Sequence, residues 1–278
     1  MNLAQALAAL AAHGTEPNRK VYRRHGARGE LYGVGFQSLD MIAQEVGVDH
    51  GLARKLWSSA RPEARLLATR IADARKVSVA ELDRWAAELD WFVGADALAK
   101  LASASPHAKK LALSWIDQKG EWVSRAGWHT LALLTRDKSI DAAFFAPLVD
   151  RIERTIHRSK NRTRDAMNAA LIAIGVRSDD FAKTCIAAAK RIGEVKVDHG
   201  APGLETPDAA TYIRRARAWL ERARAAKKRP AEKKVVAKAT KSIAKKSPKK
   251  AARRGKPGAS RVAKKTTKAA RKPAPKRR

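Results

Sequence analysis

The chain has 278 residues and a formal net charge of +32, from 59 Lys or Arg residues against 27 Asp or Glu residues. A field of this sign concentrates polyanions, which makes nucleic acid the expected partner and an anionic membrane surface the second candidate. The sequence lacks an apolar run of about 18 residues and a secretory signal, and its single cysteine excludes an intramolecular disulfide and a CxxC zinc site. We therefore expect a soluble protein of the cytoplasm, with Cys185 in its core.

Apolar residues recur at helical spacing through the first 226 residues, and the alternation typical of β-strands is missing. The expected helices cover 3–13, 38–46, 50–60, 62–73, 79–90, 92–102, 106–118, 122–135, 142–158, 163–174, 180–192 and 207–226. Pro62, Pro106 and Pro207 suit a first helical turn, while Ser78 and Asp179 suit N-caps. Residues 20–32, KVYRRHGARGELY, are basic and poor in helix signals; we expect a loop that lies across a nucleic-acid backbone or serves as a connector.

The expected helices group into pairs from Ser38 onward, with a period of about 35–40 residues. This period is typical of antiparallel helix pairs of the HEAT type, in which each pair buries its apolar face on its neighbours. The repeats are not similar in sequence, so the period alone carries the interpretation. The predicted fold is an all-α, HEAT-like helical-repeat solenoid over residues 1–226.

Basic residues gather on one side of the expected helix 142–158. Arg151, Arg154 and Arg158, here called the basic stripe, fall opposite the apolar positions of that helix, and Arg162 and Arg164 continue it across a turn. Any one of them is explained as a solvated surface residue. A run that continues over several helices favours a groove wall that faces phosphates.

Composition changes at residue 227. Residues 227–278 carry 23 Lys or Arg residues and one acid, a charge of +22, which leaves +10 on residues 1–226. The segment is built from Lys, Arg, Ala, Pro, Ser and Thr, with too few apolar residues to offset the cost of ordering it. We expect a disordered tail, similar in composition to those of linker histones, that neutralises DNA phosphates; a solubilising tail is the alternative.

The body resembles the DNA alkylation repair glycosylases built of HEAT-like repeats, through short stretches in a particular order and spacing. They are YGV at 32–34, LDMIAQEVG and DHGLARKLW within 39–57, EARLLATRIAD at 63–73, LDRWAAELDW at 82–91, EWVSRAGWHTLALL at 121–134, NRTRDAMNAALIAIG at 161–175, and VDHG with TPDAATYI within 197–213. The resemblance covers about 200 residues, nearly the whole body, and the tail lies outside it. It implies a solenoid that holds duplex DNA and excises N3- or N7-alkylated purines, whose positive charge makes them good leaving groups.

The site that the resemblance implies is matched only in part. Trp91 corresponds to the family's first tryptophan, but Ala95 stands where its acid is expected and Asp96 comes one residue later. On an ideal helix that displacement turns the side chain by about 100°. Ala169 stands where the second tryptophan is expected, and Arg125 corresponds to the arginine that grips a phosphate.

Two functions of different classes therefore remain open. One is an enzyme that hydrolyses the N-glycosidic bond of alkylated purines with Trp91 and Asp96. The other is a non-catalytic, nucleoid-associated protein that binds DNA through the same groove, and binding of structured RNA is a third candidate. In each case we expect a monomer that binds duplex DNA through Arg125, the basic stripe, Arg162 and Arg164, with no membrane, no metal and no cofactor; no Walker loop, HExxH or GxSxG motif is present.

Overall fold

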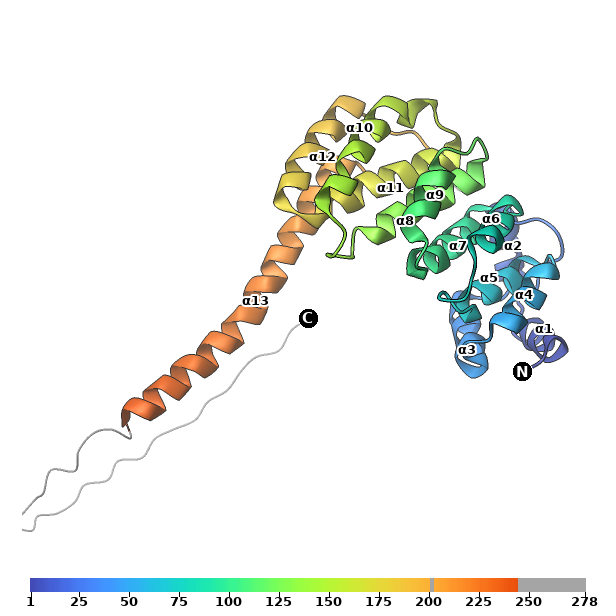
Figure 1. Cartoon of the computed structure of the whole chain (residues 1–278), viewed down its shortest axis with the longest axis horizontal. Coiled ribbons are helices and arrows are strands. Elements are labelled where there is room, and N and C mark those ends of the chain that lie inside the picture. Colours follow the sequence, from blue (N-terminus) through green and yellow to red (C-terminus); the bar gives the residue numbers. More distant parts are fainter. Residues whose placement is uncertain (201–202, 245–278) are drawn as a thin grey trace, which may run out of the picture. The chain divides into compact units, whose positions relative to one another are not determined.

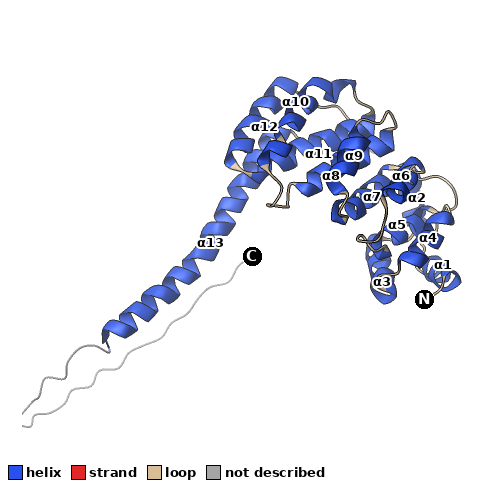
Figure 2. Cartoon of the chain, in the orientation of Figure 1, coloured by secondary structure: helices blue, strands red, loops and turns tan. Residues whose placement is uncertain are grey.

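The computed structural model describes residues 1–200 and 203–244, and side chains up to residue 226 (Figure 1). Over this part the chain is helical without a β-strand (Figure 2), and an isolated antiparallel bridge joins Gly14 and Val34. The prediction of an all-α fold is confirmed. The chain divides into a compact unit, Met1–Arg224, and a second unit, Ala225–Arg278.

The helices follow one another with short connections. In chain order they are α1 (Leu3–Ala12), α2 (Glu16–Arg24), α3 (Phe36–Val46), α4 (His50–Ser58), α5 (Pro62–Ile71), α6 (Val79–Ala87), α7 (Phe92–Ala104), α8 (Ala108–Ile116), α9 (Glu121–Leu134), the 3₁₀ turn η1 (Ala142–Phe144), α10 (Ala146–Thr155), the 3₁₀ turn η2 (Ile156–Arg158), α11 (Asn161–Arg177), α12 (Asp179–Ile192) and α13 (Ala209–Ala244).

Helices of the first unit form two rows, as in a HEAT-like solenoid. In the first row α3, α5, α7, α9 and α11 pack each on the next. In the second row α4, α6, α8, α10 and α12 are linked by side-chain contacts, for example from His50 on α4 to Glu81 on α6 and from Trp115 on α8 to Asp83 on α6. Successive pairs begin at Phe36, Pro62, Phe92, Glu121 and Asn161, so the period varies from 26 to 40 residues rather than staying near the expected 35–40.

Local signals explain most helix starts. Ser78 caps α6 by accepting a hydrogen bond from the Glu81 N–H, and Pro62 is the first residue of α5, as expected. Ser178, and not Asp179, caps α12. The helix expected over 142–158 is divided into η1, α10 and η2. The break between η1 and α10 comes where Pro147, in the first turn of α10, cannot donate to a preceding carbonyl.

The segment 20–32 is only partly a loop, which corrects the expectation. Its first residues belong to α2, which Thr15 caps and which carries Pro17 in its first turn and Arg23 and Arg24 in its last. The chain then returns past Gly33, whose φ of +80° and whose contact with the Thr15 carbonyl leave no room for a side chain. This close approach holds the start of α2 against the segment that precedes α3.

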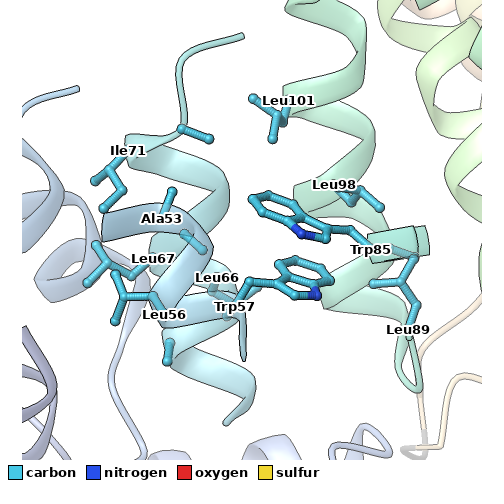
Figure 3. Close-up of a cluster of buried hydrophobic side chains, with 14 of the residues drawn as sticks. Ala53, Leu56, Trp57, Leu66, Leu67, Ile71, Trp85, Leu89, Leu98 and Leu101 are labelled. Atoms are coloured by element: carbon cyan, nitrogen blue, oxygen red, sulfur yellow. The ribbon is translucent and has the colours of Figure 1, made fainter. Parts of the chain in front are cut away.

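The core runs through the first unit as packed apolar side chains. Between α4, α5, α6 and α7 the indoles of Trp57 and Trp85 stack at 4.3 Å, with leucines from the neighbouring helices around them (Figure 3). Farther along the chain Cys185 is fully buried, as expected, and burial raises the pKa of its thiol to about 12. No helix of the described residues is long and apolar enough to cross a membrane.

The second unit begins within α13. This helix continues to Ala244, so residues 227–244, which were expected to be disordered, are helical. Their sequence is rich in Ala and Lys, and both residues favour a helix. The rest of the predicted tail, 245–278, lies outside the described residues.

Candidate nucleic-acid interface

A buried arginine joins three helices of the first row. The Arg125 guanidinium on α9 donates from Nε to Asp96 Oδ1 at 2.8 Å and from Nη2 to Asp96 Oδ2 at 2.9 Å, a bidentate pair with α7. Its Nη1 donates to Asp165 Oδ2 at 2.7 Å and to the Arg162 carbonyl at 2.9 Å, both on α11. The side chain of Arg125 is 6 % exposed, whereas those of Asp96 and Asp165 are 27 % and 22 % exposed.

The charged groups of this cluster shift one another's pKa values. Burial by itself lowers the pKa of Arg125, but the charges and hydrogen bonds of Asp96 and Asp165 outweigh burial and raise that pKa above its ordinary value. His129 lies one turn after Arg125 on α9, with its Nδ1 3.4 Å from Asp96 Oδ1. Burial, together with the Arg125 charge, lowers the pKa of His129, so its imidazole is neutral at neutral pH. The cluster therefore contains two carboxylates, those of Asp96 and Asp165, and one guanidinium that bonds to both, that of Arg125.

Trp91, which the sequence analysis placed in the site, lies in the core. It precedes α7 as its N-cap residue, is 2 % exposed and meets the Tyr22 ring edge-on at 5.4 Å. The structure does not bring it to the face that carries Asp96. Phe92 takes that place: it is half-buried, with the Arg162 and Arg125 guanidinium carbons 4.6 and 5.2 Å from its ring centre.

Phe92 and Asp96 stand four residues apart on α7, one turn of the same helical face. Ala95, at the position where the family's acid was expected, is fully buried, and Asp96 lines the surface next to Phe92. The spacing of an aromatic residue and an acid is therefore present with Phe92 as its first member. The four-residue spacing of Phe92 and Asp96 is visible in the sequence, but the prediction assigned the aromatic position to Trp91 and therefore missed it.

The position at which a second aromatic residue was expected carries an alanine. Ala169 is exposed on α11, and its methyl group offers no ring to a sugar. The sequence analysis also missed Asp165, one turn earlier on α11, because its role depends on Arg125, which lies 40 residues away.

Arg162 and Arg164 hold the loop that follows α12 against the start of α11 through hydrogen bonds. Arg162 Nη2 donates to the His199 carbonyl at 2.9 Å, and Arg164 Nη1 donates to the Lys196 carbonyl at 2.7 Å. Burial lowers the pKa of Arg162, and the neighbouring Arg125 lowers it further. Both side chains remain partly exposed, so each combines a structural contact with an accessible charge.

The three arginines of the basic stripe differ in how far their side chains are exposed to solvent. Arg151 is one-third exposed and forms an ion pair with Asp117 at 2.7 Å, and its guanidinium lies over Trp128 at 5.8 Å. Arg154 and Arg158 are exposed, and the Arg158 Nη2 donates to the Arg154 carbonyl at 2.9 Å. Of the three, Arg154 and Arg158 are the ones whose charge faces solvent.

The first turns of α7, α9 and α11 meet at one edge of the first row. Phe92 in the first turn of α7 contacts Arg162, and Glu121 at the start of α9 accepts from the Arg162 N–H at 2.6 Å. Helix N-termini carry partial positive charge and unpaired N–H groups, and both attract phosphate. A further hollow of about 760 Å³ extends from Asp96 along α7 to α2, α3 and α5.

This surface combines partly exposed guanidinium groups and helix N-termini, which attract anions, with the carboxylates of Asp96 and Asp165. No group of three or more His, Cys, Asp or Glu residues among the described side chains has the arrangement of a metal site. Arg125, which was expected to grip a phosphate, is 6 % exposed and directs its donors at Asp96, Asp165 and the Arg162 carbonyl. The exposed Arg154 and Arg158 and the half-buried Phe92 ring are the groups that suit a phosphate backbone and its sugars.

Comparison with known proteins identifies relatives along most of the chain. Residues 6–220 match the model of a family described as "DNA alkylation repair enzyme". Uncharacterised proteins of Listeria innocua and Listeria monocytogenes are each 28 % identical over 204 residues, which is 71 % of this chain and 89 % of theirs. A solved structure described as "a new family of proteins related to the HEAT-like repeat DNA glycosylases with affinity for branched DNA structures" is similar, with a TM-score of 0.72, 26 % identity, and coverage of 81 % of this chain and 96 % of that chain.

Proposed function

The chain belongs to the DNA alkylation repair enzyme family, and on this basis we propose that it binds branched DNA without excising alkylated bases. The observation that carries the proposal is the bidentate ion pair of Asp96 with Arg125. A carboxylate supports the departure of a purine by stabilising the positive charge that develops on the sugar. Both oxygens of Asp96 already accept hydrogen bonds from the Arg125 guanidinium, so neither oxygen is free to be aimed at a sugar.

The surroundings of Asp96 support the same reading. Trp91 is withdrawn into the core, Ala169 offers no ring, and Phe92 is covered by two guanidinium groups. Positioning groups for glycosidic cleavage must be held close to the sugar, and the loss of one such contact costs on the order of 10²-fold in rate. The site has the contacts of a DNA-binding surface and lacks most of those that favour catalysis.

The preference for branched DNA is supported by the relative described as having that affinity, which this chain matches at a TM-score of 0.72. In physical terms, a surface made of guanidinium groups and helix N-termini reads phosphate geometry rather than base sequence. Exposed charges such as Arg154 and Arg158, and the charge of +22 on residues 227–278, add affinity that does not depend on sequence. We propose that the protein acts as a monomer associated with the nucleoid.

Slow excision is the second candidate, and the Phe92–Asp96 spacing on one face of α7 favours it. Lesions with an intrinsically weak glycosidic bond, such as 3-methyladenine, need the least help from the protein. This activity would depend on the Asp96 carboxylate.

A competition assay tests the proposal. A labelled four-way junction is bound to the full chain at fixed salt and displaced by unlabelled junction or by linear duplex of equal length and sequence content. We expect the junction to compete at least tenfold better per nucleotide. Equal competition by the linear duplex, or displacement by structured RNA at equal concentration, would refute the preference for branched DNA.

A further inference from the structure

A hollow of about 760 Å³ lies beside the Asp96–Arg125 cluster, and the contacts described so far do not use it. Its walls come from α2, α3, α5 and α7, and its volume is in the range of sites that hold small organic groups. Four of its side chains carry rings, Tyr22 and His25 from α2, Phe36 from α3 and Phe92 from α7, and we call this set the ring pocket.

The rings of the pocket contact one another from different helices. Tyr22 and Phe36 lie with ring centres 6.4 Å apart, and His25 meets Phe92 edge-on at 5.4 Å. Tyr22 is held in place because its hydroxyl donates to the Val34 carbonyl at 2.5 Å. The helix α2 thus supplies a wall whose ring orientations are fixed, and segment 20–32 gains a role beyond that of a connector.

Two features of the ring pocket favour a ligand-binding role over a purely structural one. Phe36 is 50 % exposed and Val21, which also lines the hollow, is 40 % exposed, so apolar surface is grouped at this site. The Nδ1 atom of His25 is buried and has no hydrogen-bond partner among the described residues. Buried polar atoms are nearly always paired, so a ligand that hydrogen-bonds to this ring would complete the site.

Among the charges that line the hollow, the cations Lys100 and Arg70 fit a phosphate, and the carboxylates Asp40 and Asp96 are each paired with an arginine. Lys100 is exposed and lines the hollow, and Arg70 lies over the Phe36 ring at 5.8 Å while it pairs with Asp40 at 2.8 Å. Flat apolar walls with a hydrogen-bonding group inside and cations outside match the chemistry of a nucleotide, whose base is flat and polar at its edge and whose phosphates lie outside.

We propose that the ring pocket receives one unpaired nucleobase of the bound DNA. This inference rests on the proposed function, since branched DNA exposes unpaired or easily unpaired bases at its branch point. Stacking on aromatic rings tolerates any base, and the imidazole of His25 offers a hydrogen bond to a base edge. The phosphate beside the base would then lie next to Lys100 at the rim.

The experiment uses the full chain and a duplex with a single-nucleotide bulge of 2-aminopurine, compared with the same duplex in which 2-aminopurine is paired. We expect the wild type to bind the bulged duplex about tenfold more tightly than the paired one, a factor typical of one base–aromatic stack. We also expect the bulged base to become protected from collisional quenching by acrylamide.

Two variants report on the pocket and one serves as control. Phe36→Ala and His25→Ala should reduce the bulge preference to about twofold or less and remove the acrylamide protection, while affinity for the paired duplex stays within about twofold. Met41→Ala is the matched control, because Met41 is on the same helix as Phe36, is 48 % exposed and does not line the hollow. It should behave as wild type.

The outcomes separate the two proposals. Bulge preference and protection that persist in both pocket variants would overturn the assignment of the ring pocket. Junction binding with no protection of 2-aminopurine in the wild type would also overturn it, and would leave the proposed function standing. If the chain shows no preference for the junction over linear duplex, the proposed function itself fails.

Discussion

Replacing Arg125 with Met removes the charge that joins α7, α9 and α11 while keeping a long unbranched side chain. The guanidinium makes three hydrogen bonds to two carboxylates and one to a carbonyl, and it is almost fully buried. Without it, Asp96 and Asp165 lose the guanidinium to which both are hydrogen-bonded. We therefore expect Arg125→Met to destabilise the folded protein rather than only to weaken DNA binding.

The magnitude follows from the burial of the partners. Breaking a buried ion pair by removing one member costs about 3–5 kcal/mol. The two carboxylates are 27 % and 22 % exposed, so water solvates them in part and the lower end, about 3 kcal/mol, is expected. In a unit of this size each 1 kcal/mol lowers the Tm by about 2–4 °C, which gives a fall of about 6–12 °C.

Urea unfolding followed by tryptophan fluorescence measures this change. The triple variant Arg125→Met, Asp96→Asn, Asp165→Asn should regain part of the lost stability, because it leaves no unpaired charge. Arg154→Met, a change of the same chemistry at an exposed position, is the control and should cost less than about 0.5 kcal/mol. A loss below about 1 kcal/mol for Arg125→Met would refute the structural role of the cluster.

Three further predictions concern charge. Deleting residues 227–278 should flatten the dependence of DNA affinity on salt, since even six to ten phosphate contacts lose about 10³–10⁵ in affinity between 50 and 200 mM salt; equal slopes for both proteins would contradict this. The double variant Arg154→Ala, Arg158→Ala should weaken binding equally for every DNA sequence, and a change of sequence preference would place these residues elsewhere. The pKa of His129 is lowered in the folded protein, so the unfolded chain takes up more protons as the pH falls through about 6.5. Unfolding free energy should therefore rise with pH up to about 6.5 and then level off; His129→Gln should remove that part of the rise, and an unchanged pH profile would exclude the assignment.

The sequence predicts most of the fold because helix formation here depends on nearby residues. Periodic apolar positions and caps such as Ser78 act within one or two turns, and they locate the helices well. The exception, α2, has few apolar residues and depends on contacts with a distant segment, including the Tyr22 hydroxyl on the Val34 carbonyl. A basic pattern without apolar periodicity gave no sign of those contacts.

The site is harder to predict because its bonds cross between repeats. Arg125 pairs with Asp96 and Asp165, which lie 29 and 40 residues away, and no local pattern links them. The start of α7 was predicted at the right residue, Phe92, and the error lay in assigning the family's first aromatic position to the neighbouring tryptophan. Because one position turns a side chain by about 100°, that assignment decided which aromatic ring was expected beside Asp96.

Base release under single-turnover conditions tests the central claim most directly. The wild-type chain, in excess over DNA methylated to carry 7-methylguanine and 3-methyladenine, is incubated with it and the free bases are separated by chromatography; heat-depurinated DNA verifies detection. Because Arg125 engages both oxygens of Asp96, we predict that 7-methylguanine is released no faster than without protein, and that any slow release of 3-methyladenine is lost in Asp96→Asn. Rapid release of 7-methylguanine by the wild type would contradict the account and identify the protein as an active glycosylase.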